Sequence, residues 1–116
     1  MAKHHAQIAA ENSEIFAALL DGRKPIETRA ATPKWQAVKP GDDLEMSCSS
    51  DSAIFTVTRI EHYPTIEEMF AVIPVSQIIP GVDSVEAARD VYYSFPGYKE
   101  KLAEWGILAF WLQRHA

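Results

Sequence analysis

Apolar residues recur along the start of the chain at spacings that predict a strand and then a helix. Residues 4–10 are expected to form the strand. Apolar side chains within residues 15–20 fall on one face of a helix, which Asn12 or Ser13 can cap at its start. Gly22 follows the last apolar position, where a helix commonly ends in a residue with positive φ.

The next part of the chain has the two-residue period of strands. Strands are predicted over residues 24–30, 43–48 and 53–63. The first of them opens at Pro25, which a strand tolerates at its first position or on a sheet edge. The polar segment 49–52 is short, so the two strands that it joins are predicted to pair antiparallel.

Residues 31–40 separate these strands and are predicted to be a loop. Pro33, Trp35 and Pro40 interrupt any regular pattern there. The segment runs into a turn of type I or II at 39–42, with proline at its second position.

Helical spacing returns in the second half of the chain. Three helices are expected: one capped by Pro64-Thr65 and stopped by Pro74, one over residues 85–95 and one over residues 98–105, with a short turn at 75–79. Residues 107–113 are an apolar final strand, typical of the middle of a sheet. The order β-α-β-β-β-α-α-α-β predicts an α+β fold with a closed or nearly closed sheet and helices on its outside.

The composition narrows the class of protein. With 116 residues, 47% of them hydrophobic and 23% charged, the chain is predicted to be one globular domain, residues 1–116. The apolar run 106–112 is far shorter than the roughly 20 residues of a membrane span, and no secretory signal is expected. The lone Cys48 excludes an internal disulfide, so a cytoplasmic protein without membrane contact is predicted.

Charge is unevenly distributed along the chain. The net charge of −5 argues against a nucleic-acid binder that uses its whole surface. Yet residues 22–40 hold five cations and one acid, whereas residues 41–94 hold ten acids and two arginines. The basic segment indicates a local site for an anion such as phosphate, a nucleotide or RNA, and the alternative is a solvated loop without a partner.

The basic segment contains a short motif, Gly22-Arg23-Lys24-Pro25-Ile26-Glu27-Thr28-Arg29. A carboxylate between cations stays ionised and can hold both of them in place, and a fixed guanidinium suits phosphate or the edge of a base. Strand alternation puts Glu27 and Arg29 on one face. Lys24 joins them only if it still belongs to the preceding turn, and a purely structural salt-bridge ladder is the alternative.

This motif resembles the Gly-x-Lys-x-x-Glu-x-Arg signature of the ASCH family, small domains with a PUA-like β-barrel. Similar motifs follow in the family's order over roughly residues 6–113: Phe16, Leu20 and Gly22; the Gly41-Asp42 turn; residues 63–69; residues 79–93, with Tyr92 and Tyr93; and the strand start at residues 106–110. The resemblance implies a mixed, mostly antiparallel barrel with helices packed outside. It also implies a cleft lined by Lys24, Glu27 and Arg29.

The family resemblance also implies RNA-related binding, and for some members amidohydrolysis of N4-acylated cytidines or RNA cleavage. The amidohydrolases use a Thr–Lys–Glu triad. This sequence keeps the lysine as Lys24 but has Glu27 at the position of that threonine, and Thr28 is expected on the other face. A carboxylate is a poor substitute for an activated hydroxyl, so binding is the favoured function.

Aromatic and basic residues beyond the signature complete the predicted binding set. An exposed ring beside cations can stack on a base, whereas a ring facing inward belongs to the core. Tyr92, Phe95 and Trp105 are predicted to lie in the core. The residues predicted to bind RNA or another ligand are Arg23, Lys24, Glu27, Arg29, Trp35, Tyr93, Tyr98 and Lys99.

Three functions are therefore carried forward. The first is a binding module for RNA, a nucleotide or a modified nucleoside, with no signal specific for DNA. The second is a nucleic-acid-processing enzyme, an N4-acylcytidine amidohydrolase or a ribonuclease, with Lys24 and Glu27 as catalytic candidates. The third is a protein-interaction domain that uses the acidic helices between residues 65 and 90. No cofactor motif or metal-ligand spacing is found, and the oligomeric state stays open.

Overall fold

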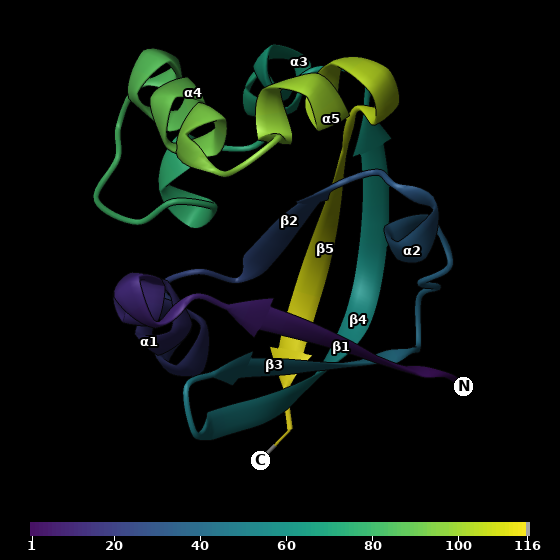
Figure 1. Cartoon of the computed structure of the whole chain (residues 1–116). Helices are drawn as coiled ribbons and strands as arrows, with labels where there is room; N and C mark the ends of the chain where they lie inside the picture. The colour runs from purple at the N-terminus through teal and green to yellow at the C-terminus, as the bar shows by residue number, and fades with distance from the viewer. Residues whose placement is uncertain (116) are drawn as a thin grey trace.

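Strand β5 (Ile107–Arg114) lies in the interior of the sheet, as its unbroken apolar run predicts. The computed structural model, which describes residues 1–115, pairs it antiparallel with β4 (Asp51–Tyr63) on one side and β2 (Ile26–Ala30) on the other (Figure 1). Its first four residues are all buried, because both faces of the strand are covered.

The five strands form one curled, mixed sheet in the order β1-β3-β4-β5-β2. Strand β3 (Asp43–Cys48) is antiparallel to β4, as expected, whereas β1 (Lys3–Ile8) is parallel to β3. The predicted α+β class is confirmed. Of the two expected forms, closed or nearly closed, the sheet is not the closed one: β1 and β2 are its two edges in residues 1–115, and the sheet is a half-barrel. Closure would require β1 to pair with another edge of the sheet. Instead, in the part of the chain that the structure describes, β1 pairs only with β3, and β5 has β2 as its second neighbour.

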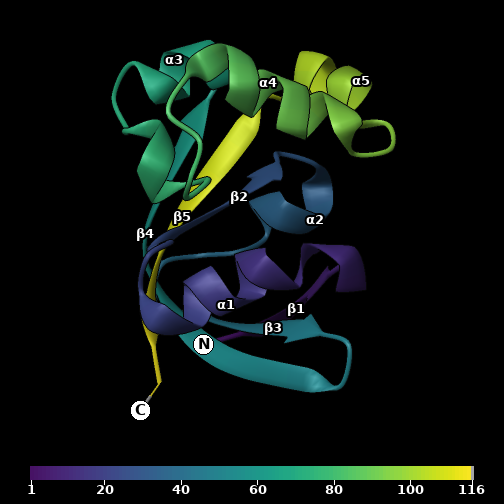
Figure 2. The same cartoon turned by 90° about the vertical axis from the view of Figure 1, so that its left-hand side faces the viewer.

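Two hydrophobic clusters lie on opposite faces of β5. Leu108 and Phe110 pack into the cluster covered by helix α1 (Ser13–Asp21). Ile107 and Ala109 pack into the other cluster, which is covered by three helices. These are α3 (Ile66–Phe70), α4 (Val85–Ser94) and α5 (Tyr98–Trp105), gathered at one end of the sheet (Figures 1 and 2). Within residues 1–115, no helix is long and apolar enough to cross a membrane.

The predicted loop at 31–40 contains a short helix, α2 (Pro33–Gln36). Thr32 precedes it in an extended conformation and Pro33 occupies its first turn, a position that suits a residue with fixed φ and no N–H. The turn that follows is of type II, because the amide of Asp42 donates to Lys39 O at 3.0 Å and Gly41 has φ of 94°.

Other predicted boundaries shift by a few residues. Strand β1 ends two residues early, and the 3₁₀ helix η1 (Ala10–Asn12) follows it. Helix α1 ends as predicted at Gly22, whose φ is 86°. Strand β4 begins two residues early, so the β3–β4 turn is tighter than expected. A second 3₁₀ helix, η2 (Val75–Gln77), lies in the predicted turn at 75–79.

Candidate functional site

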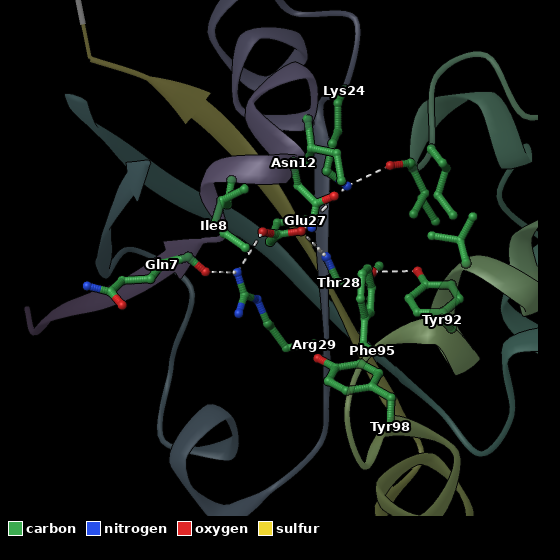
Figure 3. A pocket seen from close by; sticks show the side chains of 15 residues that line it. Gln7, Ile8, Asn12, Lys24, Glu27, Thr28, Arg29, Tyr92, Phe95 and Tyr98 are labelled. Atoms are coloured by element: carbon green, nitrogen blue, oxygen red, sulfur yellow. Dashed lines mark hydrogen bonds and ion pairs between the residues drawn. The ribbon is translucent and has the colours of Figure 1, made fainter. Parts of the chain in front are cut away.

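A pocket of about 210 Å³ opens at the free edge of β2, where the two hydrophobic clusters meet (Figure 3). The end of β1, the start of α1, the segment after η2, and helices α4 and α5 contribute its walls. Most of these walls are aliphatic or aromatic. The charged side chains in the lining come from β2 and from the turn before it.

Lys24 reaches the pocket from the turn between α1 and β2. Its amide donates to Ala18 O at 3.0 Å, which closes the end of the helix, and β2 begins two residues later. The ammonium donates to Ile26 O at 2.8 Å and to Ile78 O at 2.6 Å, and lies 3.5 Å from Oε1 of Glu27. Three acceptors thus surround a group with three N–H donors, and the side chain ties β2 to the segment after η2.

Burial lowers the pKa of Lys24, since it disfavours the charged form, while Glu27 opposes this shift. Only 4% of the Lys24 side chain is exposed. The convergence of Lys24 with Glu27, which the sequence made conditional on the turn, is therefore present in the structure.

Glu27 is the centre of the charged cluster. Its Oε1 accepts the Thr28 amide at 2.9 Å, and its Oε2 accepts Nη2 of Arg29 at 3.2 Å. Burial favours the neutral acid, but Lys24, Arg29 and the Thr28 amide outweigh it, so the pKa of Glu27 lies below its ordinary value. The group is an ionised acceptor at neutral pH and is poorly suited to act as a general base.

Arg29 spans the opening between the two sheet edges. Its Nη2 donates to Gln7 O of β1 at 3.4 Å as well as to Glu27, and its Cζ lies 5.2 Å from the centre of the Trp35 ring. The side chain is 20% exposed, the most of the three charged groups. Its hydrogen bonds to residues 1–115 use Nη2, which leaves Nε and Nη1 as donors for a ligand.

Three side chains cap the free edge of β2. Lys24 bonds the carbonyl of Ile26, Glu27 bonds the amide of Thr28, and the Tyr98 hydroxyl accepts the amide of Ala30 at 3.2 Å. An open strand edge invites pairing with another chain, and these caps reduce that risk. The edge is thus built to face a pocket instead of another strand.

Aromatic side chains from α4 and α5 form the other wall. Thr28 points away from Glu27, as alternation predicts, and its hydroxyl lies 2.6 Å from that of Tyr92. The rings of Tyr92 and Tyr98 are nearly parallel at 6.4 Å, and Phe95 meets both edge-on (Figure 3). Burial raises the pKa of both tyrosines, so the phenols stay neutral.

The structure brings four of the predicted binding residues together at the pocket: Lys24, Glu27, Arg29 and Tyr98. The other four lie elsewhere. Trp35 is buried against Phe110, with ring centres 6.2 Å apart, which corrects its prediction as a stacking surface.

The remaining three residues belong to other contacts on the surface. Arg23 pairs with Asp21 at 2.8 Å, and both side chains are exposed. Tyr93 is 41% exposed on α4, with the ammonium of Lys99 5.6 Å from its ring centre. A role for these residues in binding stays a prediction.

Sequence reasoning missed several residues of the lining. Asn12 is one of two residues predicted to cap α1, but its side chain makes no capping hydrogen bond and lines the pocket. Tyr92 was assigned to the core, where it is buried, yet its hydroxyl reaches the pocket wall. Ile8 and Ile78 have no feature in the sequence that distinguishes a pocket wall from a core position. Among residues 1–115, no group of three or more His, Cys, Asp or Glu side chains could hold a metal ion.

Comparison with known proteins identifies the fold. The crystal structure of hypothetical protein PH0355 is 26% identical, with a TM-score of 0.83 over 97% of this chain and 99% of that chain. The solution structure of protein PF0455 from Pyrococcus furiosus is 24% identical, with a TM-score of 0.72 over 95% and 96%. No family model matches the chain, and no curated protein sequence matches it. These likenesses support the α+β half-barrel, and the names of both proteins state no function.

Proposed function

We propose that the chain is an ASCH-type domain of PUA-like architecture whose pocket binds one base of an RNA, a nucleotide or a modified nucleoside. The observation that carries the proposal is the buried Lys24–Glu27–Arg29 cluster at an otherwise apolar pocket on the edge of β2. These are the three charged residues of the ASCH signature that the sequence resembles. A cytoplasmic location is part of the proposal, since the single free Cys48 is typical of a reducing compartment.

The paired donor and acceptor at the pocket suit the edge of a base. Arg29 offers free N–H groups, and Oε2 of Glu27 lies beside them as an acceptor. Arginine recognises acceptors on bases and carboxylates accept from exocyclic amino groups, so one edge with both features can meet both residues. Phe95 and Tyr98 offer aromatic surface for the ring.

The size and charge of the pocket narrow the ligand further. A volume of about 210 Å³ is below the roughly 300–1,000 Å³ of pockets that enclose a drug-sized molecule, so it suits one ring with the sugar outside. Two cations and one carboxylate leave an excess of positive charge, which favours a neutral or anionic group over a cation.

Lys24 has a positioning role in this proposal. Because its three donors are directed to Ile26 O, Ile78 O and Glu27, it supports the carboxylate and the pocket wall. Arg29 is then the cation that contacts the ligand.

Hydrolysis receives less support than binding. The low pKa of Glu27 disfavours it as a base, Lys24 is fully engaged, and the Thr28 hydroxyl bonds Tyr92 on the other face of the strand. The amidohydrolase and ribonuclease alternatives therefore lack an available nucleophile or base among the signature residues.

Isothermal titration of the ribonucleosides and their monophosphates tests the proposal, with Arg29→Ala as the variant. Loss of a paired contact to a base edge is expected to weaken the preferred nucleoside about tenfold or more. Arg59→Ala is the matched control, because Arg59 also pairs with a glutamate, Glu61, at 3.0 Å and lies 4.5 Å from a tryptophan ring. Binding that survives Arg29→Ala, or the absence of nucleoside binding to the wild type, overturns the proposal.

A further inference from the structure

Most cations of this acidic protein are paired with a carboxylate. The paired residues are Lys3, Arg23, Lys24, Arg29, Arg59 and Arg89. Five cations have no carboxylate within 4.0 Å among residues 1–115: Lys34, Lys39, Lys99, Lys101 and Arg114, of which Arg114 donates to Leu20 O at 3.0 Å. The unpaired positive charge is therefore concentrated at a few positions of the chain.

Three of these cations, all lysines, lie against aromatic rings. The ammonium of Lys34 is 4.8 Å from the ring centre of Trp35, that of Lys99 is 5.6 Å from Tyr93, and that of Lys101 is 6.0 Å from Tyr98. The face of an aromatic ring attracts a cation and limits its positions, yet leaves its N–H groups open to solvent. We call Lys34, Lys99 and Lys101 the basic strip.

Two members of the basic strip, Lys34 and Lys101, lie beside the pocket at the end of β2. The ring of Trp35 that lies near Lys34 also lies near Arg29, at 5.2 Å. On the other side, the ring of Tyr98 that lies near Lys101 is a wall of the pocket. Its hydroxyl bonds the amide of Ala30, the last residue of β2, and α2 follows three residues later. Figures 1 and 2 both show α5 above α2 beside this end of β2.

We infer that the basic strip holds the phosphates on either side of a single-stranded RNA base that fills the pocket. The inference rests on the proposed function and extends it from one base to a polynucleotide. Phosphates linked to a base in the pocket lie outside it, because the pocket has room for a ring and not for the backbone. Lysine is a hydrated point charge suited to such contacts, and in a chain with net charge −5 the attraction must be local.

Fluorescence anisotropy with a labelled single-stranded RNA of about eight nucleotides tests the inference across about 50 to 200 mM salt. The variant is Lys34→Ala/Lys101→Ala. Each phosphate contact contributes about 0.7 to the slope of log affinity against log salt, so the slope is expected to fall by about 1.4. Nucleoside affinity, measured by titration, is expected to stay within about twofold, because neither lysine lines the pocket.

A second double variant, Lys3→Ala/Lys39→Ala, removes the same charge away from the pocket and is expected to bind the RNA like the wild type. An equal loss of RNA affinity in both double variants, or an unchanged salt slope in Lys34→Ala/Lys101→Ala, overturns the inference. RNA that binds no more tightly than the nucleoside also overturns it, and leaves the pocket standing. If RNA binding depends on the basic strip but no nucleoside binds, the result supports phosphate binding by the strip and contradicts the proposed function.

Discussion

The protein contains two clusters of arginine, glutamate and tryptophan with similar contacts and different surroundings. In the pocket, Arg29 pairs with Glu27 at 3.2 Å and lies 5.2 Å from Trp35. On the exposed part of β4, Arg59 pairs with Glu61 at 3.0 Å and lies 4.5 Å from Trp111. The exposed cluster therefore has the shorter contacts.

Burial separates the two clusters. Side-chain exposure is 20% and 7% for Arg29 and Glu27, but 57% and 43% for Arg59 and Glu61. Water and salt screen the exposed pair, which makes it worth little, whereas the buried pair is held beside Lys24 in an apolar wall. A short ion pair is therefore not enough to make a binding site, whereas an ion pair buried beside an open pocket can form one.

The largest difference between the clusters is expected in stability. Glu27→Gln leaves the buried ammonium of Lys24 without its carboxylate, and breaking a buried pair costs about 3 kcal/mol. Glu61→Gln breaks an exposed pair and is expected to cost less than about 1 kcal/mol. Urea unfolding of both variants measures these changes in the free energy of unfolding.

A double variant shows whether the unpaired ammonium causes that loss. Lys24→Met added to Glu27→Gln removes the buried charge and is expected to recover at least about 1 kcal/mol. An equal loss in the free energy of unfolding for Glu27→Gln and Glu61→Gln would show that burial does not distinguish the clusters.

A smaller effect is expected at a carboxylate held by a histidine and two backbone amides instead of buried cations. Asp42 pairs with Nε2 of His4 at 2.9 Å and accepts the amides of Lys39 and Ala2, which lowers its pKa to about 2. A carboxyl with a lowered pKa stabilises the fold above its unfolded pKa of about 3.9, and this contribution is lost as the pH falls toward 2.

The Asp42→Asn variant lacks this contribution. Its melting temperature is expected to depend less steeply on pH between about 4 and 2 than that of the wild type. The pH dependence that remains includes the contribution of Glu27, whose pKa is also lowered. The melting temperature of a combined Asp42→Asn/Glu27→Gln variant is therefore expected to depend even less on pH. A melting temperature that falls as steeply with pH in Asp42→Asn as in the wild type would contradict this role of Asp42.

The charged part of the site could be predicted from the sequence because it is local. Lys24, Glu27 and Arg29 lie within six residues, and Gly22 with Pro25 permits the turn that brings the lysine to the other two. The walls could not be predicted, because they come from distant segments. An apolar residue such as Ile78 follows the same pattern whether it faces a pocket or the core.

The differences between the predicted and the observed fold also have physical causes. Pro33 and Pro40 favour a loop in the sequence, but Thr32 and Pro33 together begin the short helix α2. This helix places the Trp35 side chain in the core. Closure of the sheet depends on which edges meet. Strand β1 pairs in parallel with β3, a long-range choice that hydrophobic periodicity does not encode.

One NMR titration compares the two clusters directly, because the Arg29 cluster is proposed to bind a base and the Arg59 cluster is not. Each ribonucleoside is added to ¹⁵N-labelled protein while the Nε–H signals of Arg29 and Arg59 and the indole signals of Trp35 and Trp111 are followed. For the nucleoside that binds, we expect saturable shifts at Arg29 and Trp35 and unchanged signals at Arg59 and Trp111. Shifts confined to the exposed cluster, or no shift at Arg29 with any ribonucleoside, would contradict the proposal.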